Sequence, residues 1–153
     1  ELISGLRDIK KKGYGALVVI ELKTGLKNYI ESGIAINAEI TRELLLTLFS
    51  PKTPLHDGAV IIRNDRLVAA ACTLPLSHDA EVSKLLGTRH RAAIGISENT
   101  DAWAITVSED TGLISLARGG SLEQGIELDK LKKMLVDLYR VRLLEKSSFT
   151  RRK

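Results

Sequence analysis

The sequence lacks the features that mark proteins cross-linked by disulfides, proteins stabilised by zinc and proteins that span a membrane. Its one cysteine, Cys72, excludes an intrachain disulfide framework, and it lies in an apolar run that favours buried packing over reactivity. No group of residues has zinc-ligand spacing, no apolar run approaches the roughly 18 residues that a membrane helix needs, and no signal-peptide pattern opens the chain. The single cysteine fits a reducing setting, so we expect the domain to lie in the cytoplasm.

Aromatic residues are also scarce, and basic residues are only slightly in excess. The aromatic share of 4% argues against a stacking platform for single-stranded nucleic acid. The net charge of +4 suits an anionic partner, whether nucleotide, nucleic acid or lipid headgroup, without choosing between them. Much of the excess lies at Lys10–Lys12 and Arg151–Lys153, where solubility explains it better. Because basic residues are otherwise spread among 19 acidic ones, we expect no nucleic-acid partner.

The length and the hydrophobic pattern predict one α/β domain over residues 1–153, a mixed β-sheet flanked by helices on both faces. Short apolar runs predict strands at 16–20, 59–62, 67–71, 102–107 and 113–117, the last four as two hairpins, with a weaker strand at 34–36. Helical spacing predicts one helix over residues 1–12, a second that is capped by Asn37 and ends at Pro51, and a third over residues 79–86. A further helix is predicted to begin at Thr88, and the last one follows a cap at Asp129. In the last helix we expect these residues to be buried: Leu131, Met134, Leu135, Leu138, Val141 and Leu144. We expect the basic tail, 146–153, to be disordered.

The familiar phosphate-binding and nucleophile motifs are absent. There is no G-x-x-x-x-G-K-[ST] loop, and Gly13-Tyr14-Gly15 precedes a strand instead of following one, so it is not a dinucleotide fingerprint. No nucleophile elbow exists either. Candidate chemistry therefore lies in three other stretches.

The first stretch, residues 53–59, leads from a proline-rich loop into a strand. Gly58 allows a ligand to approach the backbone, because it has no Cβ. The Asp57 carboxylate can accept a hydroxyl proton or bind a metal, and the adjacent His56 can also ligate a metal. By itself this stretch is better explained as a turn, since Asp-Gly is common in turns.

The second stretch is Gly87-Thr88-Arg89-His90-Arg91. Thr88 is a good helix cap, and free N–H groups at a helix start favour an anion. Arg89 and Arg91 add cations whose geometry suits phosphate. The pattern fits phosphate binding as well as it fits a solvated basic turn.

The third stretch is Ser108-Glu109-Asp110-Thr111-Gly112, between the strands of the second hairpin. Carboxylates and hydroxyls at a strand end can hold a hard divalent cation. Acidic hairpin turns are ordinary, so this stretch alone indicates little.

Together the three stretches resemble the diadenylate cyclase domain family, which is defined by an Asp-Gly-Ala and an Arg-His-Arg motif. Here these are Asp57-Gly58-Ala59 and Arg89-His90-Arg91. The fuller strings PLHDGAVII, LPLS, GTRHRAA and VSEDTG resemble the membrane-associated branch, and the resemblance covers about residues 13–140.

The resemblance implies roles for individual residues. Asp57 would help to activate the ribose 3′-hydroxyl of ATP, and Leu74 would offer its backbone to the adenine edge. His56 and Asp110 would bind manganese or magnesium, with cobalt as a further candidate. Relatives commonly have glutamate where this chain has Asp110, and an aromatic where it has Thr73. The remaining expected nucleotide contacts and catalytic residues are Gly58, Ala59, Thr88, Arg89, His90, Arg91, Ser108 and Glu109.

The resemblance also implies partners. Two ATP molecules would be joined into cyclic di-AMP with release of pyrophosphate, which needs a homodimer with two facing sites. Because the chain starts at Glu1 without a methionine, we expect it to be a piece of a longer protein. That parent would be held in the cell membrane by N-terminal spans connected through the 1–12 helix, with a regulatory protein as a possible partner. The alternative is a non-catalytic nucleotide-binding module of the same fold.

Overall fold

The computed structural model describes residues 1–79 and 86–151. Its described strands form one mixed sheet in the order β2-β4-β3-β1-β5-β6-β7, in which β1 pairs with β3 in parallel and every other neighbouring pair is antiparallel. The strands are β1 Ala16–Glu21, β2 Ile34–Glu39, β3 Ala59–Arg63, β4 Arg66–Cys72, β5 Trp103–Val107, β6 Ile114–Arg118 and β7 Ser121–Glu123. The predicted single α/β domain with a mixed sheet is confirmed.

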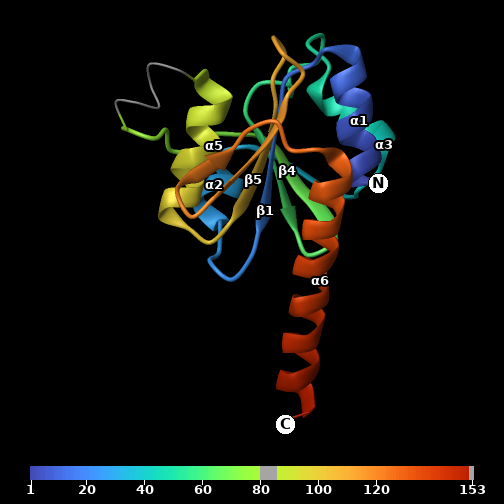
Figure 1. Cartoon of the computed structure of the whole chain (residues 1–153), viewed down its shortest axis with the longest axis vertical. Coiled ribbons are helices and arrows are strands. Elements are labelled where there is room, and N and C mark those ends of the chain that lie inside the picture. Colours follow the sequence, from blue (N-terminus) through green and yellow to red (C-terminus); the bar gives the residue numbers. More distant parts are fainter. Residues whose placement is uncertain (80–85, 152–153) are drawn as a thin grey trace.

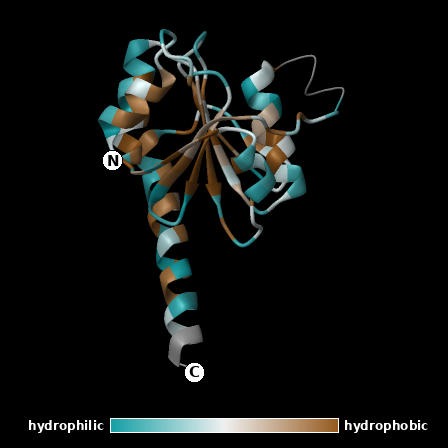
Figure 2. Cartoon of the chain, turned by 180° about the vertical axis from the view of Figure 1, so that it is seen from behind, coloured by the Kyte–Doolittle hydropathy of each residue, from teal (hydrophilic) through white to brown (hydrophobic). Residues whose placement is uncertain are grey.

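Helices cover both faces of this sheet (Figure 1). One face packs against α1 Leu2–Lys12, α3 Arg42–Phe49 and the first part of α6 Leu128–Arg151. The other face packs against α2 Lys27–Glu31 and α5 Thr88–Asn99. The residues of β1 alternate between the two: Val18 and Ile20 join the first core, Leu17 and Val19 the second. A strand that is buried on both faces has a continuous run of apolar residues, which is why residues 16–20 could be recognised as a strand from the sequence. Figure 2 shows hydrophobic strands at the centre of the molecule, between the two groups of helices.

Local capping explains where the helices begin and end, and it corrects three expectations. Gly13 ends α1 in the left-handed conformation, with φ 72°. Thr41 rather than Asn37 caps α3, its Oγ1 accepting a hydrogen bond from the Leu44 N–H at 3.1 Å. Asn37 instead lies within β2 at a positive φ of 51°. Thr88 is the first residue of α5, whose cap is Gly87, and Asp129 lies in the first turn of α6.

The last helix departs furthest from expectation. Leu131 and Leu135 are buried, but Val141 and Leu144 are 53% and 65% exposed, so their predicted burial is wrong. The helix extends away from the body of the molecule (Figure 1), and there its apolar side chains have no sheet to pack on. Helix α6 continues to Arg151 and so includes part of the tail that begins at residue 146, whose disorder stays a prediction. Residues 152–153 and most of the predicted 79–86 helix lie outside the described residues.

Two short elements, α2 and β7, are absent from the sequence-based prediction. Each is too short to give a clear hydrophobic period. Within residues 1–79 and 86–151, no helix combines the length and the apolar character needed to cross a bilayer.

Candidate active site

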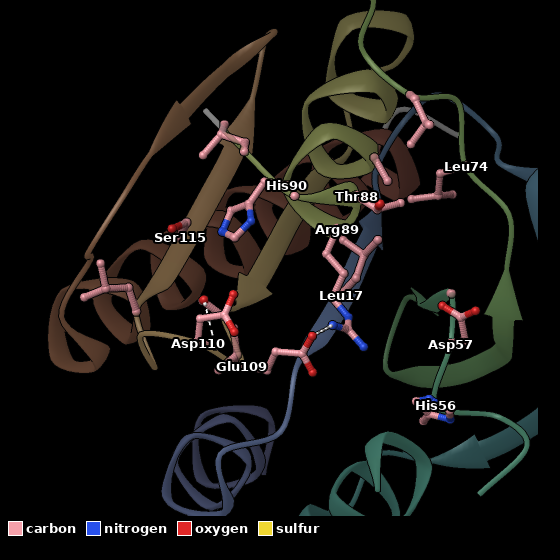
Figure 3. Close-up of a pocket in the computed structure, with 18 of the residues that line it drawn as sticks. Leu17, His56, Asp57, Leu74, Thr88, Arg89, His90, Glu109, Asp110 and Ser115 are labelled. Atoms are coloured by element: carbon pink, nitrogen blue, oxygen red, sulfur yellow. Dashed lines mark hydrogen bonds and ion pairs between the residues drawn. The ribbon is translucent and has the colours of Figure 1, made fainter. Parts of the chain in front are cut away.

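A cavity of about 1120 Å³ opens where the loop before β3, the start of α5 and the end of β5 meet. Figure 3 shows the side chains that project into it from these elements. Its volume is slightly larger than the roughly 300–1,000 Å³ typical of pockets that hold a small organic ligand. Of the predicted site residues, those that line it are His56, Asp57, Gly58, Leu74, Thr88, Arg89, His90, Ser108, Glu109 and Asp110.

One wall comes from the loop that enters β3. Gly58 has φ 103°, and a Cβ there would lie 2.8 Å from the backbone of Ala71 and Cys72, so this position requires glycine. The His56 ring nitrogen Nδ1 lies 2.7 Å from the Thr53 carbonyl oxygen, where it donates a hydrogen bond. That bond orients the ring and leaves Nε2 to a ligand.

Ala59 does not line the cavity. It lies in β3 opposite Cys72 and is fully buried. The expected contact of Ala59 with the nucleotide therefore finds no support in the cavity lining, and it stays a prediction.

The start of α5 forms the opposite wall and carries a positive electrostatic field. Gly87 gives this helix no side-chain cap, so within residues 1–79 and 86–151 the first N–H groups of α5 are left for a ligand. Thr88, Arg89 and His90 all line the cavity beside them. Burial lowers the pKa of His90, and the neighbouring Arg89 charge lowers it further, which favours the neutral imidazole. An anion fits this end of the cavity.

Arg91 is not part of the cavity lining. Its side chain leaves the helix about 200° around from that of Arg89, because successive helical residues are about 100° apart. Its backbone instead holds the neighbouring segment, since the Arg91 carbonyl accepts a hydrogen bond from the Ser77 N–H at 3.0 Å. The Arg-His-Arg motif thus contributes one arginine to the cavity and one outside it.

The acidic turn after β5 completes the lining. The Ser108 hydroxyl oxygen accepts N–H groups from Asp110 at 3.3 Å and from Thr111 at 3.2 Å. The Ser108 O–H therefore remains available to donate to a ligand. Glu109 Oε1 lies 3.6 Å from a terminal nitrogen of Arg89. The turn is thus ordered around Ser108, and one of its carboxylates faces the arginine.

The two predicted metal ligands come from opposite sides of the cavity. His56 belongs to the β3 loop and Asp110 to the turn after β5 (Figure 3). Among the residues that the structure describes, no group of three or more histidine, cysteine, aspartate or glutamate side chains gathers as a metal site. Two protein donors still fit a magnesium-type ion, because such ions usually bind one or two carboxylates together with substrate phosphates.

The segment around Leu74 packs closely on α5. Leu74 is 8% exposed and lines the cavity. A Cβ on Gly95 would collide with the carbonyl oxygen of Pro75 and lie 2.7 Å from its carbonyl carbon. The absence of a side chain at Gly95 therefore sets how near the Leu74 backbone comes to the helix.

We expect Gly95→Ala to destabilise the protein by at least about 1–3 kcal/mol, the usual cost of overpacking, because backbone atoms cannot move aside as a side chain can. Its melting temperature should fall well below that of Gly25→Ala, where an added Cβ meets no atom within 4 Å. Equal melting temperatures for the two variants would show that the segment is not packed as described.

Several lining residues were not among the candidates that the sequence indicated. They include Leu17, Ser115 and Gln124. Ser115 is 1% exposed and faces Thr106 across the β5–β6 pair, and neither hydroxyl has a hydrogen-bond partner among the described residues. Strand alternation could place Ser115 on a face of the sheet, but not beside a cavity that other segments build.

Cys72 also lines the cavity, although it is almost wholly buried. Burial raises the pKa of its thiol to about 11. The thiolate is therefore negligible at neutral pH, so the expectation of packing rather than reactivity fits this environment.

An α/β domain with a cavity suited to an anionic ligand is the class that this fold and cavity define, and comparison with known proteins gives the family. Residues 3–122 match the DAC family model, described as "DisA bacterial checkpoint controller nucleotide-binding". The chain belongs to this family.

Individual relatives are similar over most of the chain. It is 54% identical over 125 residues to "Cyclic di-AMP synthase CdaA" of Bacillus subtilis, an alignment that spans 82% of this chain and 46% of that protein. A double mutant of DacA from Staphylococcus aureus has a crystal structure with TM-score 0.86 and 46% identity, covering 89% of this chain and 91% of that one. A structure described as a "hypothetical membrane spanning protein" from Bacillus cereus has TM-score 0.78 and 43% identity, covering 82% of this chain and 62% of that one. The chain thus spans about half the length of the Bacillus subtilis relative.

Proposed function

We propose that this domain is a diadenylate cyclase, which condenses two ATP molecules into cyclic di-AMP and two pyrophosphates. The observation that carries the proposal is that one cavity holds both Asp57 and the Arg89 end of α5, in a chain 54% identical to a cyclic di-AMP synthase. This reaction needs a carboxylate that can accept the proton of a hydroxyl group, and it needs a cationic helix start that can bind a triphosphate.

In the proposed complex, ATP spans the cavity from Leu74 to the start of α5. Adenine would lie along the Leu74 backbone, and the ribose beside Gly58, where no side chain intervenes. The triphosphate would receive the first N–H groups of α5, the Arg89 guanidinium and the Ser108 hydroxyl. Neutral His90 would supply a further hydrogen bond in the same region.

A divalent ion, manganese or magnesium and in vitro also cobalt, completes the proposal. His56 Nε2 and the Asp110 carboxylate are the residues that would hold it, with ATP oxygens filling the remaining positions. When bound, the ion offsets negative charge on the phosphoryl oxygens. Asp110 is shorter by one methylene than the glutamate that the resemblance leads us to expect, so metal preference is the property that this residue would tune.

The chain's own groups account for the proton and the charge of each step. Asp57 accepts the proton of the 3′-hydroxyl, whose oxygen forms a bond to the α-phosphorus of the other ATP. The bond from that phosphorus to the bridging oxygen breaks, and pyrophosphate leaves. Arg89 stabilises charge on the phosphate oxygens while this happens. Two such steps close the ring.

Ring closure requires two subunits, because each chain is proposed to hold one ATP. We expect two copies to face each other across their cavities, and alignment of the two nucleotides is then the main contribution to the rate. Tethering of the parent protein to a membrane would raise the effective concentration of facing sites. The similarity to a protein described as membrane-spanning supports that part of the proposal, and a gene without a hydrophobic segment upstream of Glu1 would refute it.

Specific activity should therefore rise with enzyme concentration. The measurement is a dilution series at saturating ATP, read as rate per milligram. Constant specific activity down to nanomolar protein would contradict assembly during turnover and would indicate a preformed catalytic dimer.

The proposed reaction is tested most simply with 3′-deoxy-ATP. It lacks the attacking oxygen, so it should bind and inhibit competitively without forming any cyclic dinucleotide, whereas ATP should be converted. The alternative, a non-catalytic nucleotide-binding module of the same fold, predicts that both nucleotides bind and neither reacts. A regulatory protein partner also belongs to the proposal, and a pull-down with the full-length parent would test it.

A further inference from the structure

Gly15 lies just before β1 and is buried, yet its backbone does not require glycine. Gly13, two residues earlier, has the positive φ of 72° that ends α1, whereas Gly15 does not adopt such a conformation. The reason for glycine at this position is therefore the space that a side chain would fill.

That space is occupied by the end of the Arg89 side chain. A Cβ on Gly15 would lie 2.6 Å from Arg89 Cζ and 3.2 Å from Nε, and it would overlap the terminal nitrogen Nη1. The three nearest atoms all belong to Arg89. The guanidinium thus rests directly on the Gly15 backbone.

From this position Arg89 reaches toward the turn after β5. Ala16 pairs with Val107, so Gly15 lies at the end of the sheet where Ser108 and Glu109 leave β5. The Arg89 Nη1 is 3.6 Å from Glu109 Oε1, while its Nε is buried and has no hydrogen-bond partner among the described residues. The ion pair is long and its carboxylate is 58% exposed. Contact with the Gly15 backbone is therefore an important constraint on where the guanidinium lies.

We propose that Gly15 is a positioning residue for Arg89. Because Gly15 has no side chain, the Arg89 guanidinium can lie against the Gly15 backbone while it faces the triphosphate. This inference rests on the proposed function for the identity of the anion. Because the atoms that a methyl group would meet are the far end of a flexible side chain, the fold can absorb Gly15→Ala by moving Arg89. Gly95 differs, since a methyl group there meets backbone.

The test compares Gly15→Ala with Gly25→Ala, whose added Cβ meets nothing within 4 Å. Both changes lower the conformational entropy of the unfolded chain by a similar amount, so Gly25→Ala controls for the effect of this entropy on stability. We expect Gly15→Ala to weaken ATP binding about tenfold, since a charge-assisted contact is misplaced, and to leave adenosine binding unchanged. A purely structural role would weaken both ligands or neither.

A second comparison does not depend on how well Gly15→Ala folds. In an Arg89→Ala background the collision disappears, so adding Gly15→Ala should change the melting temperature only as Gly25→Ala does, and it should leave ATP affinity unchanged. The inference is overturned if Gly15→Ala binds ATP like the wild type, if both ligands weaken equally, or if the same losses persist without Arg89.

These readouts are independent of turnover. If the wild type binds ATP but forms no cyclic dinucleotide, the proposed function fails, whereas a selective loss of ATP binding in Gly15→Ala still supports the inference. If the wild type is active and Gly15→Ala is unchanged, the inference alone fails.

Discussion

Asp57→Asn is expected to lower the rate of cyclic di-AMP formation about 10²–10⁴-fold, the usual contribution of a positioned general base. The amide keeps the shape of the carboxylate but cannot accept the proton of the 3′-hydroxyl. ATP affinity should change little, because the proposed triphosphate contacts come from α5 and the turn after β5, not from the loop that carries Asp57. Turnover and equilibrium binding are measured on the same preparation.

A matched control is Asp65→Asn, at the exposed turn between β3 and β4. It makes the same change of charge away from the cavity and should keep wild-type activity. Wild-type turnover in Asp57→Asn would exclude the role of Asp57, and equal loss in both variants would indicate a general effect of charge.

Arg89→Ala is expected to weaken ATP binding about 10- to 150-fold relative to adenosine, which corresponds to about 1.5–3 kcal/mol for a charge-assisted contact. Arg91→Ala should have a smaller effect on this ratio, because Arg91 does not line the cavity. Titration of both ligands against both variants provides the measurement. If the two variants lose ATP affinity equally, the asymmetry between the arginines is wrong; if adenosine weakens as much as ATP, Arg89 does not contact the phosphates.

The sequence was sufficient for most of the sheet. Strand β1 is buried on both faces and gives a continuous apolar run, and the two hairpins have clear turns. Helix α6 shows the limit of the same reasoning, because Val141 and Leu144 continue the helical spacing of Leu131 and Leu135 beyond the point where the sheet ends. Periodicity identifies an apolar face but not the length of the surface that covers it.

For the site, motif resemblance indicated segments that meet at one cavity, but it could not orient every side chain. Asp57 and Arg89 lie 32 positions apart in the sequence and line the same cavity. Arg91 and Ala59 belong to the same motifs and lie outside it, because one side chain leaves α5 on another side and the other is buried in the sheet. The Arg89 contact with Gly15 was not predictable, since it joins residues from separate elements through side-chain packing.

The central claim is that this domain makes a cyclic dinucleotide, and identification of the product tests it most directly. The purified chain would be incubated at high concentration with ATP and Mn²⁺, with Mg²⁺ and Co²⁺ in parallel, and the products resolved by mass. The account predicts cyclic di-AMP with two pyrophosphates for each molecule formed, and about 10²–10⁴-fold less of it with Asp57→Asn at matched times. Bound ATP without any cyclic dinucleotide in all three metals would contradict it.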